Sequence, residues 1–332
     1  MPQGRNAAPV SAVPTLAELG ERTVLERLRP FCSAQVGDDA AVRSVAAGDQ
    51  LVTTTDVLVD GVHFSEQTTP PQSVGWRAAA VNLSDLAAMG ARPLGLTVGL
   101  ALPGETPWPW LEAVYQGLAD CLGAFGGEIL GGDLCRSPVA SLAVTALGEV
   151  APAQVIYRTA ALPEQAIVIT GGHGLSRAGL ALLQGADAAA VPSGTRQRWI
   201  AAHQFPRPRF DAIALLQSLN PHHRPIAGMD SSDGLADAIL QLCQSSGVGA
   251  QLAPLPLPAG LSDWVGPAQA LDWTLYGGED FELVLCLPPD LAEALVQALP
   301  GCAMIGQTTS VPTQIAVAGQ PLRPSRAYQH FG

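Results

Sequence analysis

The sequence predicts two α+β domains, and three observations support that fold class. Segments rich in Val and Thr alternate with segments of helical spacing, yet strands often follow strands directly, which favours mixed sheets over a regular βαβ pattern. Hydrophobic residues make up 48% of the chain and charged residues only 14%, so there is ample apolar material for two cores. The length of 332 residues also suits two domains of ordinary size.

The boundary between the domains is predicted at Ala151-Pro152-Ala153-Gln154, which has the composition of a linker. We therefore expect an N-terminal domain at 16–150 and a C-terminal domain at 151–332. Residues 1–15 are rich in Pro, Ala and Ser and contain no apolar signal core, so we expect a disordered leader.

In the N-terminal half, the run from 73 to 89 is apolar nearly all round and predicts a buried helix. Gly90 suits the left-handed cap that would end it. The other elements expected here are a helix at 16–30, a turn into a strand at 36–42, strands at 51–59, 94–102 and 139–150, a helix at 110–122, and Ile129-Leu130 leading into Gly131-Gly132-Asp133.

In the C-terminal half, a strand, a Gly-rich turn and a helix begin the domain. Residues 186–209 read as irregular, and 254–267 read as a Pro-rich loop. The elements expected are strands at 166–170, 281–287, 302–305 and 315–317, and helices at 176–183, 211–219, about 235–245 and 291–299.

Charge and composition exclude several functions. The net charge is −12 with a pI near 4.8, whereas nucleic-acid binding needs a basic surface. All 17 basic residues are arginine, which excludes a P-loop, a protein-kinase lysine and Schiff-base chemistry. If this chain handles phosphate, then metal ions, arginine and backbone N–H groups must meet the charge.

The six cysteines are scattered, with no CxxC pair and no histidine at ligand spacing. Reduced thiols are therefore expected rather than disulfides or a zinc site. No apolar run approaches the roughly 18 residues of a membrane span. We expect a cytoplasmic protein with neither a membrane nor a nucleic acid as partner.

Asp85 stands in the middle of the predicted buried helix. A lone buried carboxylate is costly unless it is paired, hydrogen-bonded or metal-bound. Asn82 lies one helical turn back on the same face. A satisfied core aspartate is the alternative to a ligand, and this stretch alone does not decide between them.

Other carboxylates fall at turns beside Gly, Ser and Thr, where they can project into a cleft. Converging carboxylates repel one another strongly, and Mg²⁺, which prefers oxygen ligands, waters and phosphates, resolves that repulsion. Each motif alone is weak, because a Gly-Asp-Asp turn is common and Asp-x-Ser-Asp-Gly can simply cap a helix. Together they favour a site for several Mg²⁺ ions and phosphate. The motifs are Gly37-Asp38-Asp39, Thr53-Thr54-Thr55-Asp56, Asp85, Gly132-Asp133, Asp230-Ser231-Ser232-Asp233-Gly234 and Gly277-Gly278-Glu279-Asp280.

As a set, these motifs resemble those of the thiamine-monophosphate kinases, a family of the PurM-like (aminoimidazole-ribotide-synthetase-like) ATP-binding superfamily. The resemblance runs in order from about residue 16 to 331 and includes Gly61-Val62-His63-Phe64 and Asn82-Leu83-Ser84-Asp85-Leu86-Ala87-Ala88-Met89-Gly90. It implies a two-domain PurM-like fold, with a mixed-sheet N-terminal domain that dimerises and an α/β C-terminal domain. It also implies ATP-dependent phosphorylation of thiamine monophosphate to thiamine diphosphate, with several Mg²⁺ ions.

The resemblance also implies roles for individual residues, with none acting as acid or base. The metal ligands would be Asp39, Asp56, Asp85, Asp133 and Asp230, assisted by Thr54 and Thr55, with Asp233 holding a further ion. The ATP contacts would be Tyr115, Gly132, Asp133, Arg158 and Ser232, and the contacts to thiamine monophosphate would be His63, Glu279 and Tyr328.

Simpler interpretations exist for some of these residues. His63 reads equally well as a loop histidine with a backbone partner, Tyr115 as a core aromatic and Tyr328 as a surface aromatic. After Gly131-Gly132-Asp133 the family commonly has small hydroxyl residues, whereas Leu134 and Cys135 stand here, so the contacts at that point are in doubt.

Three other functions compete with this one. The first is another ATP-using enzyme of the same superfamily. The second is a dinucleotide-binding oxidoreductase, prompted by Thr170-Gly171-Gly172-His173-Gly174, although its glycines are not spaced as GxGxxG. The third is a protein that binds nucleotide or metal without catalysis.

Overall fold

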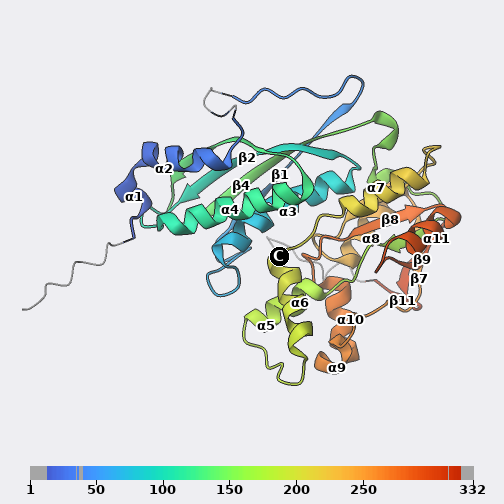
Figure 1. The fold of residues 1–332 in the computed structure, drawn as a ribbon. Helices are drawn as coiled ribbons and strands as arrows, with labels where there is room; N and C mark the ends of the chain where they lie inside the picture. The colour runs from blue at the N-terminus through green and yellow to red at the C-terminus, as the bar shows by residue number, and fades with distance from the viewer. Residues whose placement is uncertain (1–12, 35, 37–39, 313, 323–332) are drawn as a thin grey trace, which may run out of the picture.

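The computed structural model describes residues 13–34, 36, 40–312 and 314–322. Two sheets organise this part of the chain, one of four strands in the N-terminal half and one of seven strands in the C-terminal half (Figure 1). Both sheets mix parallel and antiparallel neighbours, so the α+β prediction is confirmed.

The N-terminal sheet has the strand order β1-β4-β2-β3, which leaves β1 and β3 at its two edges. The central strand β4 runs antiparallel to both β1 and β2, and β3 runs parallel to β2. The strands are β1 (Gln50–Val59), β2 (Arg92–Leu102), β3 (Ile129–Arg136) and β4 (Ser141–Val150). Asp133 therefore lies within an edge strand rather than in the turn that the sequence suggested.

Two helices, α3 (Pro71–Ala88) and α4 (Trp108–Phe125), cover one face of this sheet (Figure 1). They pack very closely because a Cβ atom on Gly75 would lie 1.8 Å from the carbonyl oxygen of Val114, and one on Gly117 would lie 1.9 Å from that of Gln72. As predicted, α3 is buried around most of its circumference.

The opposite face of the sheet is open in the single chain. On the edge strand β1, Leu51 and Val57 point to that side with 57% and 49% of their surface exposed. An open apolar face beside an unpaired strand edge is typical of a surface that another chain covers.

The predicted first helix is broken in two, α1 (Leu16–Leu19) and α2 (Glu21–Leu28). Gly20 between them has a φ of 73°, which a continuous helix does not allow, and Thr15 and Glu18 form a capping box at the first start. Of the strand expected at 36–42, residues 37–39 lie outside the described residues and 40–42 are not in a strand.

The C-terminal sheet has the order β11-β10-β7-β9-β5-β8-β6, with helices on both faces. Ala166 and Val168 of β5 pack toward α7 (Phe210–Leu219) and α11 (Pro289–Ala298), while Ile167 and Ile169 pack toward α8 (Leu235–Ser246). This explains the continuous apolar run of β5. The strands are β5 (Ala166–Ile169), β6 (Ala227–Asp230), β7 (Gly249–Leu252), β8 (Leu283–Leu287), β9 (Ala303–Thr309), β10 (Ile315–Val317) and β11 (Gln320–Pro321).

The helices of this half include three that the sequence did not predict, namely α6 (Ser193–Gln204), α9 (Leu261–Val265) and α10 (Pro267–Tyr276). In α6, Trp199 and His203 are the buried residues and the rest is mostly polar, so helical periodicity is weak. Pro267 stands at the start of α10, where proline is well tolerated. The predicted helices are α5 (Leu175–Leu183), α7 (Phe210–Leu219), α8 (Leu235–Ser246) and α11 (Pro289–Ala298).

Helix α3 also joins the two halves. Its last residues, Ala87 and Ala88, share a buried cluster with Ile156 and with α7. Trp76 donates from Nε1 to the carbonyl oxygen of Pro206 at 2.7 Å. The residues of α3 that face the C-terminal half are therefore fixed relative to it.

Candidate active site

Strand β1 and helix α3 bring the first part of the site together. Thr54 donates from Oγ1 to Oδ2 of Asp85 at 2.5 Å. The backbone N–H of Asp56 donates to Oδ1 of Asn82 at 3.1 Å. Asn82 thus aligns the strand with the helix, and Thr54 orients the half-buried Asp85.

The second part comes from the C-terminal half, where β6 ends at Asp230. Ser84 of α3 donates from Oγ to Oδ2 of Asp230 at 2.8 Å, and Asp230 is 2% exposed. Ser84 and Asp85 are successive residues of α3. Ser84 bonds to the carboxylate of Asp230 in the other half, and Asp85 bonds to Thr54 of β1.

Asp56, Asp85, Asp230 and Asp233, which we call the acidic group, act on one another electrostatically. Burial, and then the charges of Asp85 and Asp233, raise the pKa of Asp56 to about 6. Burial, and then the charge of Asp85, raise the pKa of Asp230 to about 7. Burial also raises the pKa of Asp85, against the opposing effects of the Thr54 hydrogen bond and Arg158. A cation bound near these carboxylates would offset their mutual repulsion and favour their charged forms.

The acidic group does not by itself form a complete metal cage. In the part of the chain that is described, no three His, Cys, Asp or Glu side chains are placed to hold a metal ion. Mg²⁺ commonly binds through one or two carboxylates and completes its coordination with water and substrate phosphates. The donor set of carboxylate and hydroxyl oxygens fits that kind of binding.

Burial raises the pKa of both Asp85 and Asp230, and the charge of Arg158 offsets part of that rise, so its guanidinium lies within electrostatic range of the acidic group. It lies in a 3₁₀ turn that follows the predicted linker. Its Nη1 donates to Oε1 of Gln241 on α8 at 2.7 Å, and its carbonyl oxygen accepts from Ser246 Oγ at 2.7 Å. Helix α8 therefore fixes the exposed guanidinium beside the carboxylates.

Tyr115, Gly132 and Asp133 lie in a different place. They line a cavity of 370 Å³ together with Cys32 and residues of α2, beside the edge strand β3. Strands β1 and β3 are three strand spacings apart, about 14 Å. Within one chain, Asp133 is therefore not part of the acidic group, contrary to the expectation that these aspartates converge.

The register of the sheet also separates the predicted ligands by face. Thr55 contacts Thr145 across the strands through their hydroxyls at 2.8 Å, on the open face. Asp133 aligns with Gly99 and Ala143 and so shares that face, because residues in one register row point to the same side. Thr54 and Asp56 point toward α3.

Glu279 and His63 lie on the side of the acidic group that faces α6. Glu279 has a φ of 58°, and Gly278 and Phe281 are also left-handed, which is costly for residues other than glycine. The carboxylate of Glu279 pairs with Arg77 of α3, and its backbone N–H donates to Ser232 O at 2.7 Å. His63 accepts from the backbone N–H of Val59 at Nδ1, at 3.1 Å. The predicted residues Asp39 and Tyr328 lie outside the described residues.

Sequence reasoning missed Arg77 and Ser84, although a signal was present. Arg77 stands inside a helix whose other positions are almost all apolar, and an arginine there needs a partner. Ser84 directly precedes Asp85, but its hydrogen-bond partner Asp230 is 146 positions away in the chain.

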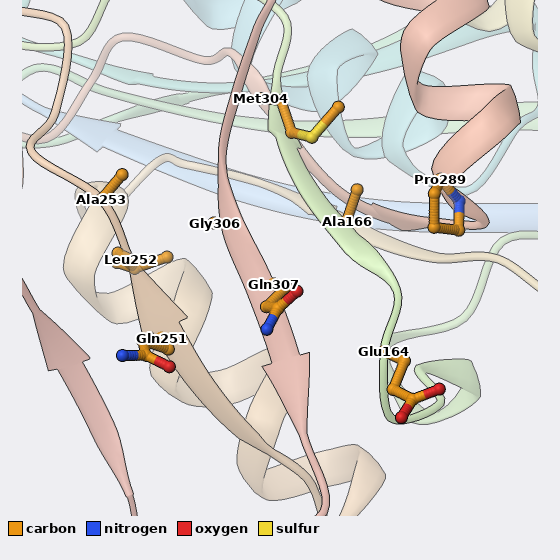
Figure 2. A pocket seen from close by; sticks show the side chains of 9 residues that line it. All are labelled: Glu164, Ala166, Gln251, Leu252, Ala253, Pro289, Met304, Gly306 and Gln307. Carbon is orange, nitrogen blue, oxygen red and sulfur yellow. The ribbon is translucent and has the colours of Figure 1, made fainter.

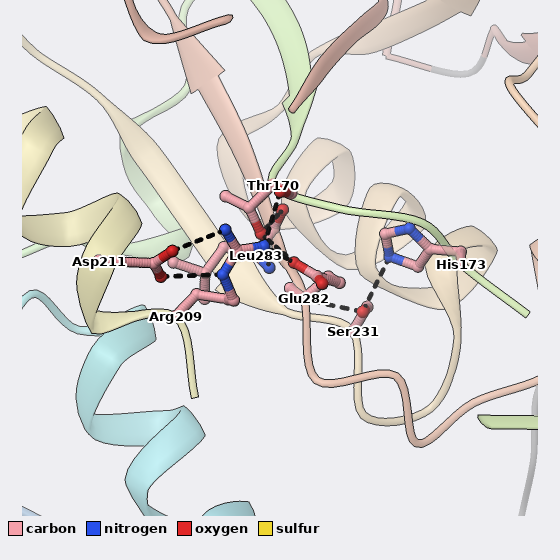
Figure 3. Close-up of polar contacts among 7 residues, drawn as sticks. All are labelled: Thr170, His173, Arg209, Asp211, Ser231, Glu282 and Leu283. Atoms are coloured by element: carbon pink, nitrogen blue, oxygen red, sulfur yellow. Dashed lines mark hydrogen bonds and ion pairs between the residues drawn. The ribbon is translucent and has the colours of Figure 1, made fainter. Parts of the chain in front are cut away.

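A second polar cluster lies behind the Asp230–Asp233 turn, and its carboxylate is neutralised by arginine (Figure 3). Arg209 pairs with Glu282 and with Asp211, and donates to the carbonyl oxygen of Thr170 at 2.6 Å. Ser231 donates to Glu282 O at 3.0 Å. Through Ser231, this cluster holds the Asp230–Asp233 turn in place.

The Gly-rich loop before α5 does not hold a dinucleotide. The carboxylate of Asp280 accepts from the backbone N–H groups of Gly174 and Ser176, at 2.6 and 2.9 Å. These donors form the helix N-terminus that would otherwise bind a pyrophosphate. The chain's own carboxylate fills that position, which contradicts the oxidoreductase alternative.

A separate cavity of 510 Å³ lies on the C-terminal sheet over β5, β7 and β9 (Figure 2). Glu164, Gln251, Met304 and Gln307 line it, and it contains none of the predicted site residues. It is therefore not the candidate active site.

Comparison with known proteins places the chain in a family. Models of the AIR synthase related protein match here, with the N-terminal domain at residues 37–150 and the C-terminal domain at 163–318. The sequence is 52% identical to the thiamine-monophosphate kinase of Synechococcus elongatus over 324 residues, which cover 96% of this chain and 98% of the relative. The chain belongs to the thiamine-monophosphate kinase family.

Solved structures of thiamine-monophosphate kinases agree with this membership. The enzyme from Stenotrophomonas maltophilia K279a has a TM-score of 0.79 at 32% identity, covering 90% of this chain and 96% of that one. A structure described as "AaThiL complexed with AMPPCP and TMP" has a TM-score of 0.76 at 29% identity, covering 97% and 100%. The resemblance read from the motifs and the two-domain PurM-like fold are thereby confirmed.

Proposed function

We propose that this protein phosphorylates thiamine monophosphate to thiamine diphosphate with ATP as donor. Its membership of the thiamine-monophosphate kinase family supports the reaction, as does its similarity to a structure that holds AMPPCP and TMP. The observation that carries the proposal is the acidic group itself. Burial raises the pKa of Asp230, and the charges of Asp85 and Asp56 from the other half raise it further, at the place where two anionic substrates would have to meet.

Phosphoryl transfer to this acceptor depends mainly on charge neutralisation and on alignment of the two substrates. The acceptor is already a phosphate, so its oxygen is anionic near neutral pH and needs no strong base. Mg²⁺, when bound, supplies the positive charge that such transfers require. Asp56, Asp85 and Asp230 would hold it, with Thr54 orienting Asp85. We expect direct in-line transfer without a phosphoenzyme.

The remaining predicted residues receive roles that fit their positions. Arg158 would bind phosphate with its planar guanidinium, which Gln241 holds in place. Tyr115 and Gly132 would line the nucleotide cavity beside β3. His63 and Glu279 would bind the acceptor. Further predicted contacts are Thr55, Ser232 and Asp233, and Asp39 and Tyr328 outside the described residues.

We further propose a homodimer in which the second copy covers the open face of the N-terminal sheet. The exposed Leu51 and Val57 and the positions of β1 and β3 at the two edges of the sheet support this. If β3 of one copy lies beside β1 of the other, the second copy's Asp133 comes within about one strand spacing of the predicted ligands of β1. A single chain holds them three strand spacings apart.

The division into domains near residue 150 and the cytoplasmic location stay predictions. All six cysteines, each within the described residues, are free thiols. No helix among the described residues is long and apolar enough to cross a bilayer.

The test is product formation by the purified protein with ATP, Mg²⁺ and either thiamine or thiamine monophosphate, followed by chromatography. We expect thiamine diphosphate from the monophosphate alone, and none after a chelator is added. Product from neither acceptor, with ATP binding intact, would favour another enzyme of the superfamily or a non-catalytic protein.

A further inference from the structure

Arg77 is a buried cation in the middle of α3 that holds three groups outside its own helix. Its side chain is 1% exposed. Nη1 donates to the carbonyl oxygen of His203 in α6 at 2.6 Å. Nη2 pairs with the carboxylate of Glu279 and also donates to the carbonyl oxygen of His63 at 3.5 Å. One guanidinium therefore contacts both described residues that are expected to bind the acceptor.

These contacts close a ring that returns to the acidic group. Ser84, two turns further along α3, donates to Asp230, which also accepts from Ser232 Oγ at 3.3 Å. The carbonyl oxygen of Ser232 accepts from the backbone N–H of Glu279 at 2.7 Å. Since Glu279 pairs with Arg77, the ring joins α3, the Asp230–Asp233 turn and the loop at 277–281.

The loop at 277–281 depends on its surroundings for its shape. Glu279 and Phe281 have φ angles of 58° and 52°, and left-handed conformations of such residues persist only where contacts over-determine them. Asp280 is held by the N-terminus of α5. Arg77 holds the loop from the other side, through Glu279.

Stability alone does not account for Arg77. A buried ion pair is often replaceable by apolar side chains without loss of stability, because desolvation offsets the attraction. In addition, Nε of Arg77 is buried without a hydrogen-bond partner among the described residues. Replacing both partners by apolar side chains, with a methionine at position 77, would avoid that desolvation.

We propose that Arg77 is a positioning residue for the acceptor. It sets the Glu279 carboxylate and the His63 backbone at a fixed separation from Asp85, so that a bound organic phosphate is aligned with the acidic group. This rests on the proposed function, in which His63 and Glu279 bind thiamine monophosphate. Arg77 itself acts through them.

The test compares full-length Arg77→Met and Arg77→Lys with the wild type. We expect Arg77→Met to raise the KM for thiamine monophosphate by about tenfold or more and to change the KM for ATP by less than about twofold. Arg77→Lys keeps the charge and is expected to recover part of the loss. Calorimetry should show weakened binding of thiamine monophosphate to the AMPPCP-loaded protein and unchanged binding of AMPPCP itself.

Arg209→Met is the matched control, because the Arg209 side chain is only 12% exposed and also pairs with a glutamate, in the cluster behind the turn (Figure 3). It is expected to lower Tm without changing the ratio of the two KM values. An unchanged ratio in Arg77→Met, or an equal change in Arg209→Met, would overturn the inference. If Arg77→Met does not fold, the ratio of the KM for thiamine monophosphate to the KM for ATP in Arg77→Lys tests the inference instead. A wild type that makes no thiamine diphosphate refutes the proposed function instead, and the calorimetry then tests Arg77 by itself.

Discussion

Two sets of carboxylates in this protein differ in how their charge is neutralised. Glu149, Glu279 and Glu282 each pair with an arginine of the same chain. Asp56, Asp85 and Asp230 face one another instead: besides burial, Asp85 raises the pKa of Asp56 and of Asp230, and Asp56 also raises that of Asp230. The paired carboxylates hold elements together, whereas the acidic group is arranged to receive positive charge from outside.

The difference shows how a chain without lysine can separate structure from function. Arginine stays charged and presents several donors, so it can neutralise a carboxylate permanently. The acidic group lies at the junction of the two halves, where α3 meets β1 and β6. Its repulsion is a cost that the fold bears until a cation and phosphates bind.

The largest effect is expected from Asp85→Asn, which removes one member of the acidic group. We expect kcat/KM to fall by about a thousandfold or more, because charge neutralisation is the main source of the rate. Tm without Mg²⁺ should not fall, since repulsion is reduced. Steady-state kinetics and thermal melts measure both effects. Asp290→Asn, at an exposed ion pair with Arg224, is the control and should change neither. Near-normal turnover of Asp85→Asn at limiting Mg²⁺ would contradict a ligand role.

The second prediction concerns Asp133, which the single chain holds apart from the acidic group. Asp56→Asn and Asp133→Asn should each be nearly inactive. If the two residues of one site come from different copies, mixing the variants and allowing subunit exchange leaves one intact site in each heterodimer. About a quarter of the wild-type activity should then return. Mixtures that remain inactive, with heterodimers demonstrated by a mass tag, would refute the shared site.

The third prediction concerns a carboxylate that is paired with an arginine, Glu282. Arg209→Met leaves the buried Glu282 carboxylate and the carbonyl oxygen of Thr170 without their donor. We expect a loss of about 3 kcal/mol or more in the free energy of unfolding, measured by urea titration. The double variant Arg209→Met/Glu282→Leu should lose less, because the carboxylate that then remains without its arginine, Asp211, is largely exposed. Equal losses in the two variants would show that packing, not charge, decides.

The smallest effect is expected in how the free energy of unfolding depends on pH, through His203 beside the Arg77–Glu279 pair. His203 lies beside Arg77, Arg177 and Glu279, and burial, followed by Arg77, lowers its pKa to about 4. Below pH 6.5 the unfolded chain binds a proton that the folded chain does not, so stability should fall as the pH drops from 6.5 toward 4. His203→Gln should remove about 2 kcal/mol of this dependence. An unchanged pH dependence of stability in His203→Gln would contradict this prediction.

Much of the fold was predictable because its signals are local. The apolar run of α3 and the Val- and Thr-rich β1 needed no tertiary information. In contrast, α6 and α10 were missed because one is mostly polar and the other begins with a proline inside a Pro-rich stretch. Gly20 divides the first helix through its φ angle, which hydrophobic spacing does not reveal.

The candidate site was predictable in its residue types but not in its layout. The sequence identified Asp56, Asp85 and Asp230, which the structure brings together. It did not reveal that β3 lies at the opposite edge from β1, because strand order is a non-local property. It also did not identify Arg77, whose role depends on Glu279, 202 positions away in the chain.

The contacts of α3 limit how this chain can change during evolution. Arg77 and Asp85 are eight positions apart on one helix, which fixes about 12 Å between their Cα atoms along the axis. Inserting one residue between them would rotate Arg77 by about 100° relative to Asp85 and break the ring through Glu279. Exposed turns such as 221–223 can gain or lose residues without this penalty. Descendants of this sequence are therefore free to vary in those turns, while the segment from 77 to 85 must keep its length.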